Sequence, residues 1–547
     1  MKDLLNYKHI WHTLRGGKPL SYFNRAYMFF ILPLIVIIYN IIPKKLRPII
    51  LLLASFIVYY LFSSKLIGYL LLSILSIYIS GMIMNKIDDK KEVEIENHKG
   101  NKKELKIKYK RYKKIVLLLS VIFNLSFLFF FKYLPFFKTN GNLLLDLFNI
   151  DYKFKIIKHL APIGISFYTL EAISYLVDVY NNKIKGDKNI IRLALYLSFF
   201  PQIMEGPIAR YSDTAQDLYS GKKVTYENFC FGYQRIFYGI LKKTVIANRV
   251  NILVKLVFEN YTQYSAIAII MAIMGYTLML YAEFSGTMDI VIGSGEMFGV
   301  RIPENFKRPF FAKNVSEFWT RWHITLGTWF KDYIFYPISL SSPVKKITKF
   351  FRKIFGNRTG AVLSGGIALF AVWFLNGLWH GAGYTFLVFG LYHFLMIFLG
   401  GLFEPLVIKT CNFIHINRKN IVYRVFQSMK MTMLIFIGEL FFRAPDLKTA
   451  FGMLSKIFTK FSLTPLKTGE LLELGLGKHD FLVLIASVMG LIIIGLIQEK
   501  GINIRKSVSN KNIIIRWIIY YALILAIVIF GAYGPGYAPV DPIYADF

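Results

Sequence analysis

Apolar stretches of about 20 residues recur along most of this chain, and they constrain its fold more than any other feature. A helix of that length can cross the roughly 30 Å hydrocarbon core of a membrane. With 55% of its 547 residues hydrophobic, the chain is also too apolar for an ordinary soluble protein. The sequence therefore predicts an all-α, polytopic bundle of transmembrane helices. Roughly a dozen spans or half-spans are expected. The stretches lie near 27–42, 48–63, 66–84, 115–137, 160–179, 190–207, 265–283, 360–379, 384–403, 427–442, 480–498 and 514–532.

Helix breakers and polar residues interrupt some of these stretches. Pro201-Gln202 and Glu205-Gly206-Pro207 both fall inside the stretch at 190–207. Irregular backbone at membrane depth is tolerated only where protein, rather than lipid, surrounds it. We therefore expect a re-entrant or tilted segment at this point.

The formal net charge of +34 comes mainly from Lys and Arg in the segments between apolar stretches. The positive-inside rule predicts that placement for a multi-pass membrane protein, so nucleic-acid binding is not expected. The segment 85–114 mixes many lysines with acidic residues. It predicts a solvated cytoplasmic loop that also contacts anionic lipid headgroups.

The N-terminal residues 1–26 form a polar leader. No small-residue cleavage site follows the first apolar stretch, so a cleaved secretory signal is not expected. His9, Trp11 and His12 suit either an amphipathic segment on the membrane surface or a cytoplasmic tail.

Acidic residues interrupt apolar sequence in the central part of the chain, where an isolated charge is costly. We expect Glu171 to be a buried carboxylate paired with a basic residue. Glu205 and Arg210 flank a Gly-Pro helix breaker, so they either satisfy each other or hold a ligand. Glu283 and Asp289 lie six residues apart on one predicted helix and do not share a face. They are expected to hold neighbouring segments together rather than to act jointly in catalysis.

Two of the nine histidines stand in apolar sequence beside tryptophans. His323 follows Trp319 and Trp322, and His380 follows Trp379 directly. An imidazole at membrane depth is costly, and together with the tryptophans this favours a functional over a structural role for both. Neither has His, Cys, Asp or Glu neighbours at zinc-ligand spacing, so a metal site is not expected.

The remaining histidines give weaker signals. His393 lies beside Tyr392 on an apolar stretch and is expected to be a satisfied histidine of the bundle. No Gly-x-Ser-x-Gly elbow is present, so the chain is not expected to supply a serine nucleophile. A histidine base acting on the hydroxyl of another molecule, as in acyl transfer, fits better and contributes roughly 10² to 10⁴-fold. Proton relay in a transporter uses the same residue types and stays open.

An ordered set of motifs runs through the chain. The central motifs are Phe284-Ser285-Gly286, Pro303-Glu304-Asn305-Phe306, Arg308-Pro309-Phe310, Glu317-Phe318-Trp319-Thr320-Arg321-Trp322-His323, Trp329-Phe330-Lys331-Asp332-Tyr333, Asn376-Gly377-Leu378-Trp379-His380-Gly381-Ala382 and Leu391-Tyr392-His393. Downstream are Phe441-Phe442-Arg443-Ala444 and Asp541-Pro542-Ile543-Tyr544-Ala545-Asp546-Phe547. The set closely resembles the membrane-bound O-acyltransferase (MBOAT) family, and the downstream motifs resemble its bacterial alginate O-acetylation-protein type.

The resemblance implies a ring of helices around a central tunnel, with re-entrant segments. By position, His380 matches the family's catalytic histidine, and His323 matches its second important histidine, an orienting partner. The acidic residues Glu171, Glu205 and Glu283 depart from the family's usual residues, so donor or acceptor preference can differ. Residues expected to line the tunnel or contact substrate are Glu205, Arg210, Glu283, Trp319, Arg321, Trp322, Asn376 and Trp379.

The resemblance also implies a division of the chain and a function. Residues 160–400 are expected to form the catalytic core, between N-terminal helices at 27–137 and C-terminal helices at 401–547. The implied function is O-acetylation of a secreted or cell-surface polysaccharide, with the acetyl group passed across a bacterial cell membrane. The expected donor is acetyl-CoA, with no bound cofactor, and the expected partner is an extracytoplasmic SGNH-like acyltransferase or esterase. D-alanyl transfer to teichoic acid is one alternative, and a proton-coupled transporter or flippase is another.

Overall fold

The computed structural model describes residues 22, 27–97, 102–156, 161–533, 537 and 540. Within these residues the chain is helical, and its β structure is an isolated antiparallel bridge between Phe306 and Trp322. The predicted all-α fold is therefore confirmed. The described residues form two compact units, one from 1–233 with Val291–Pro303 and the other from 234–290 with 304–546.

Two sets of predictions lie outside the described residues: those for His9, Trp11 and His12, and the motif at 541–547. Within the predicted leader, Tyr22 is described. Its side chain is buried, and its hydroxyl donates a hydrogen bond to the carbonyl of Phe200 at 3.0 Å.

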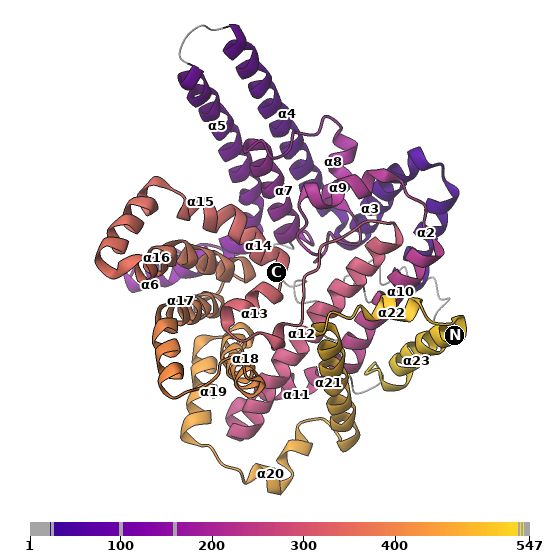
Figure 1. Cartoon of the computed structure of the whole chain (residues 1–547), viewed down its shortest axis with the longest axis vertical. Helices are drawn as coiled ribbons and strands as arrows, with labels where there is room; N and C mark the ends of the chain where they lie inside the picture. The colour runs from indigo at the N-terminus through magenta and orange to yellow at the C-terminus, as the bar shows by residue number, and fades with distance from the viewer. Residues whose placement is uncertain are drawn as a thin grey trace. The chain divides into compact units, whose positions relative to one another are not determined.

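The first unit is built mainly from helices that follow one another along the N-terminal part of the chain (Figure 1). They are η2 (Tyr27–Ile31), α2 (Leu32–Ile41), η3 (Lys44–Leu46), α3 (Arg47–Ser63), η4 (Ser64–Leu66), α4 (Ile67–Asn97), α5 (Lys102–Leu128), η5 (Phe129–Tyr133), α6 (Leu134–Leu147), α7 (Ile165–Tyr180), α8 (Ile190–Ser198) and α9 (Tyr211–Ser220). Two further helices have residues in both units: α10 (Tyr226–Leu241) and α12 (Ala266–Met297).

The second unit contains the rest of the helices. They are η6 (Lys242–Ala247), α11 (Asn248–Glu259), η7 (Tyr261–Gln263), η8 (Pro309–Phe311), α13 (Val315–Arg321), α14 (Ile324–Phe330), η9 (Lys331–Phe335), α15 (Tyr336–Ser339), α16 (Ser342–His380), α17 (Tyr384–Phe413), α18 (Ile421–Arg443), α19 (Leu447–Thr459), α20 (Pro465–Thr468), η10 (Glu470–Glu473), α21 (Lys478–Glu499), α22 (Ile504–Ser509) and α23 (Ile513–Phe530).

Among the described residues, eight helical segments are long and apolar enough to cross a membrane. Most of the predicted spans lie within these segments and are confirmed as candidates, while the stretch at 27–42 forms a shorter apolar helix. In α21 and α23 almost none of the apolar window is buried, as expected for helices that face lipid. The eight are Lys44–Asn97, which contains α3 and α4, Lys102–Leu147, α12, α16, α17, α18, α21 and α23.

Of the predicted spans and half-spans, the stretches at 160–179 and 190–207 form helices too short to be candidate spans. Helix α7 has 16 residues and α8 has 9, and neither is among the candidate spans. At 1.5 Å per residue, α8 is only about 14 Å long. The expected break is confirmed: α8 ends at Ser198, and a turn-rich segment with Pro201 and Pro207 leads to α9.

The charged segment 85–114, predicted as a loop, is helical wherever it is described. Helices α4 and α5 extend through it and run side by side (Figure 1). Lys and Glu are good helix formers, and ion pairs stabilise the hairpin. Asp88 accepts hydrogen bonds from Lys91 on its own helix and from the buried Lys113 on α5, both at 2.6 Å.

Helices α16 and α17 form a closely packed antiparallel pair in the second unit (Figure 1). Glycine makes this approach possible, since a Cβ at Gly390 would lie 2.4 Å from the carbonyl oxygen of Trp373. A Cβ at Gly377 would lie 2.5 Å from the carbonyl oxygen of Phe386. The last residue of α16, His380, is therefore held against the first turns of α17.

Candidate active site

His323 lies at the N-cap of α14, where its backbone adopts the left-handed conformation (φ 46°, ψ 51°). Histidine tolerates this region better than most residues, but the conformation still costs about 1–2 kcal/mol. Two backbone hydrogen bonds hold the loop in place. The Ile324 N–H donates to the Asn305 carbonyl at 3.0 Å, and the Lys307 N–H donates to the Arg321 carbonyl at 2.9 Å. The segment that begins at Asn305 therefore positions the buried His323 ring.

His380 ends α16 and is buried, with 5% of its surface exposed. Its ring packs against Trp379, Phe389 and Phe442, with centroid distances of 5.0, 5.7 and 5.0 Å. One turn earlier on the same helix, Asn376 is buried, and its Oδ1 accepts no hydrogen bond from any described residue. An imidazole enclosed by aromatic rings is largely shielded from water.

The indole of Trp379 brings the two predicted histidines into one cluster. Its ring centroid lies 5.8 Å from that of His323 and 5.0 Å from that of His380. Phe389 extends the contact from His380 to His393, whose ring centroid is 4.7 Å from it. We call these five residues the histidine cluster. Three buried imidazoles are thus joined through two aromatic rings.

His393 makes the contacts of a structural histidine. Its side chain is fully buried, and its Nδ1 accepts a hydrogen bond from Trp319 Nε1 at 3.3 Å. Trp319 and Trp373 pack against its ring, with centroid distances of 4.8 and 5.2 Å. The prediction of a satisfied bundle histidine is confirmed for Nδ1, while its place beside Phe389 in the cluster was not foreseen.

Gly438 on α18 leaves room for the His393 ring. A Cβ there would lie 2.3 Å from His393 Nε2. We expect Gly438→Ala to displace the imidazole and to destabilise the protein by about 1–3 kcal/mol, the usual cost of overpacking a core. Thermal unfolding of the purified protein in detergent measures this. Gly400→Ala is the matched control, because nothing lies within 4 Å of its Cβ; equal melting temperatures for the two variants would contradict the prediction.

Arg321 and Trp322, both predicted to line the tunnel, have other contacts. Arg321 forms ion pairs with Glu317 and with Glu499 of α21, both at 2.8 Å. Trp322 is buried and stacks on Phe318, with ring centroids 5.3 Å apart. These contacts hold α13 in place, and a role of either residue in substrate binding stays a prediction.

The carboxylates on α12 pair with cations of neighbouring segments. Glu283 forms a buried ion pair with Lys243 at 2.5 Å, and Lys243 belongs to η6. Asp289 pairs with Lys242 at 2.5 Å and with Arg235 at 2.9 Å. The expectation that these acids hold segments together is confirmed, while lining of a tunnel by Glu283 stays a prediction.

Three of the predicted polar residues belong to the first unit. Glu171 is buried on α7, and its carboxylate accepts hydrogen bonds from the Gln202 amide and from the Ala209 N–H at 3.2 Å. Burial raises the pKa of Glu171 to about 8. The predicted burial is confirmed, and the basic residue that acts on this carboxylate is Arg210, whose charge opposes the rise in its pKa. The two hydrogen-bond donors are neutral, and they tie α7 to the turn-rich segment after α8. Glu205 is buried in that segment, and Arg210 donates to the Ile208 carbonyl at 3.4 Å.

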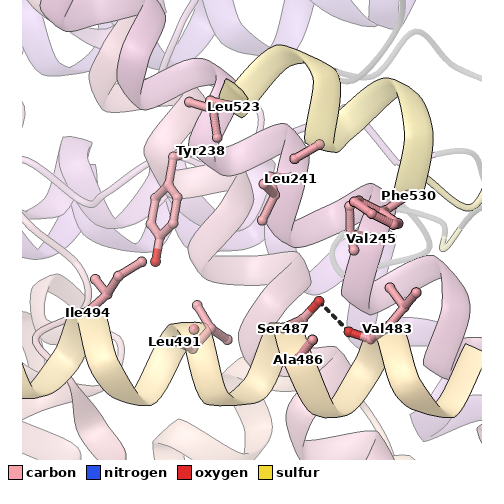
Figure 2. A pocket seen from close by; sticks show the side chains of 12 residues that line it. Tyr238, Leu241, Val245, Val483, Ala486, Ser487, Leu491, Ile494, Leu523 and Phe530 are labelled. Carbon is pink, nitrogen blue, oxygen red and sulfur yellow. Dashed lines mark hydrogen bonds between the residues drawn. The ribbon is translucent and has the colours of Figure 1, made fainter. Parts of the chain in front are cut away.

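An apolar cavity of about 360 Å³ lies among α10, η6, α21 and α23 (Figure 2). Its polar side chains are Tyr238 and Ser487, and the Ser487 hydroxyl donates to the Val483 carbonyl within its own helix. The lining contains none of the predicted site residues. Among the described residues, no group of three His, Cys, Asp or Glu side chains could hold a metal ion.

Asn305 is a buried neighbour of His323 whose importance was hard to see in the sequence. Its side-chain Oδ1 lies 3.3 Å from His323 Nδ1 and accepts hydrogen bonds from Thr325. What pointed to Asn305 in the sequence was its position in the Pro303-Glu304-Asn305-Phe306 motif, 18 residues before His323. Only the folded loop brings the two side chains together.

Comparison with known proteins gives relatives named for three different activities. The chain is 34% identical over 343 residues to the protein named probable alginate O-acetylase AlgI of Pseudomonas syringae pv. tomato, covering 63% of this chain and 60% of that protein. It is 33% identical to the peptidoglycan O-acetyltransferase of Helicobacter pylori, covering 52% and 54%. It is 30% identical to the teichoic acid D-alanyltransferase of Bacillus subtilis, covering 44% and 59%. The chain thus spans less than two thirds of the length of each of these relatives.

The family model for membrane-bound O-acyltransferases matches residues 56–441. That range contains the histidine cluster and all the predicted site residues. Together with the eight candidate spans among the described residues, it identifies a multi-pass membrane protein. The chain belongs to the membrane-bound O-acyltransferase family.

Proposed function

We propose that this protein is an O-acyltransferase that passes an acetyl group from a cytoplasmic thioester donor, acetyl-CoA, to a secreted or cell-surface polysaccharide. The observation that carries the proposal is the contact of one indole, Trp379, with both His323 and His380 inside the range matched by the family. Relatives named as O-acetyltransferases and O-acetylases support the acetyl group.

His380 is the proposed general base. A hydroxyl oxygen of the acceptor attacks the carbonyl carbon of the acyl thioester, and the hydroxyl proton passes to the neutral imidazole. The carbon–sulfur bond then breaks, and the thiolate leaves and takes up a proton. The aromatic surroundings of His380 suit this step, because exclusion of water prevents hydrolysis of the thioester and strengthens hydrogen bonds in the site. His323 is the proposed orienting partner.

Delivery of the acyl group outside the cell is the proposed task of a second protein, an extracytoplasmic SGNH-like acyltransferase or esterase. The acyl group crosses the membrane along a tunnel within the helical ring, lined by residues such as Glu205 and Arg210. Neither histidine stands in a serine-nucleophile motif, so a partner that carries such a serine complements this chain.

D-alanyl transfer to teichoic acid is the second candidate. It is favoured by the similarity to the B. subtilis D-alanyltransferase, which is 30% identical over 244 residues. Both candidates use the same base and the same attack on a carbonyl, and they differ in the acyl group and the donor.

The test compares cells that produce the protein with cells that lack it. Esters are released from the isolated cell-surface and secreted polymers by mild alkali, and acetate and D-alanine are measured by mass spectrometry. We expect acetate that depends on the protein. Protein-dependent D-alanine would favour the second candidate. If neither acetate nor D-alanine depends on the protein, attention turns to a transporter or flippase.

A further inference from the structure

The buried Asn305 side chain makes hydrogen bonds from both ends of its amide beside His323. Its Oδ1 accepts from the Thr325 N–H at 3.0 Å and from the Thr325 hydroxyl at 2.9 Å. On the other side, its Nδ2 donates to the sulfur of Met288 at 3.2 Å. Asn305 is 0% exposed, so neither end of the amide reaches solvent.

These contacts determine which way the amide faces. A backbone N–H can only donate, so the Asn305 atom opposite the Thr325 N–H is the oxygen and not the nitrogen. The reversed amide would set its NH₂ against that N–H and lose the hydrogen bond to the thioether of Met288.

The amide in turn determines the tautomer of His323. His323 Nδ1 lies 3.3 Å from the same Oδ1. An unprotonated Nδ1 would place its lone pair against the oxygen, so Nδ1 carries the proton and Nε2 bears the lone pair. Burial lowers the pKa of His323 to about 3, so the imidazole is neutral at physiological pH. Nε2 makes no hydrogen bond with any described residue.

We propose that Asn305 is a positioning residue that holds His323 as the Nδ1–H tautomer, so that Nε2 accepts a hydrogen bond from a hydroxyl of the acyl acceptor. The role assigned to the hydroxyl rests on the proposed acyl transfer. An unprotonated Nε2 cannot donate to the carbonyl of an acyl donor, so it discriminates in favour of the hydroxyl-bearing substrate.

The tautomer can be measured without any substrate. Protein labelled with ¹⁵N in its histidine rings is studied by NMR in lipid bilayers, and the His323 signals are identified by their loss in His323→Gln. We expect a protonated Nδ1 and an unprotonated Nε2. The opposite pattern would overturn the proposal whether or not the protein transfers acyl groups.

Two substitutions distinguish the effect of the acceptor oxygen on the His323 tautomer from the effect of side-chain packing. Asn305→Asp keeps an oxygen opposite Nδ1, whereas Asn305→Leu has a similar size but no acceptor. We expect the aspartate variant to keep the Nδ1–H tautomer and the leucine variant to lose it. If the leucine variant does not fold, the spectra of the wild-type protein and of Asn305→Asp still test the tautomer of His323. A tautomer that is unchanged in Asn305→Leu, or lost in Asn305→Asp, would overturn the proposal.

The functional consequence is tested in the ester assay. Asn305→Leu is expected to lower acyl transfer by about 10- to 100-fold, the range typical for losing a partner that orients a histidine. Asn305→Asp is expected to retain more activity, and equal losses would overturn the proposed role. If the wild-type protein forms no ester, the proposed function fails, but the NMR result still tests the tautomer.

Discussion

A His380→Ala variant is expected to lose acyl transfer while reaching the membrane at the wild-type level. Removing the general base should lower the rate by about 10²- to 10⁴-fold, because the acceptor hydroxyl must then lose its proton without a positioned base. The alanine leaves a gap among Trp379, Phe389 and Phe442. The contact between Phe389 and Phe442, with ring centroids 5.2 Å apart, does not involve His380. The measurement is the ester content of the polymer, normalised to the amount of protein on an immunoblot.

His479→Ala is the matched control, because His479 is exposed at the start of α21 and belongs to no part of the histidine cluster. It should leave ester content unchanged. Wild-type ester content in His380→Ala at equal protein would remove His380 from the mechanism. In that case the same assay on His323→Ala would show whether the second histidine is the base.

The fold was predictable where hydropathy and helix length decide it. The apolar stretches at 265–283 and 480–498 became α12 and α21 because each can form about 20 residues of helix without a proline. Prediction was right about the break inside 190–207 and failed at 85–114. In the first, two prolines and a glycine indicated the break, although hydropathy alone suggests a longer helix than α8. In the second, charge suggested a loop, although Lys and Glu favour helix when two helices can pack together.

The site was predictable from residue type only in part. Tryptophan and histidine in one motif pointed to His323 and His380, but their shared contact with Trp379 depends on how α14 meets the end of α16. Asn305 could not be assigned, because its partner lies 18 residues away across a backbone bridge. Pairing across such distances is a property of the tertiary structure, whereas sequence patterns report mainly local periodicity.

Breaking the buried ion pair between Lys243 and Glu283 is expected to destabilise the protein strongly. Their side chains are 5% and 1% exposed, and the charged atoms lie 2.5 Å apart. Lys243→Met leaves the carboxylate buried without its cation, which typically costs about 3–5 kcal/mol. Thermal unfolding in detergent should therefore show a much lower melting temperature. As a control, Lys255→Met breaks an exposed pair with Glu259 at 4.0 Å, which is worth at most about 1 kcal/mol.

The double variant Lys243→Met/Glu283→Met distinguishes a structural pair from a functional one. Replacing both charges by apolar side chains removes the unpaired charge, so most of the lost stability should return. Recovery should be incomplete, because Lys243 also donates a hydrogen bond to the carbonyl of Val540 at 2.9 Å, and a hydrogen bond is worth about 1 kcal/mol. A stable double variant with wild-type ester content would make the pair structural only. A stable variant without esters would assign Glu283 or Lys243 to the tunnel, and Lys243→Met with wild-type stability would contradict the prediction itself.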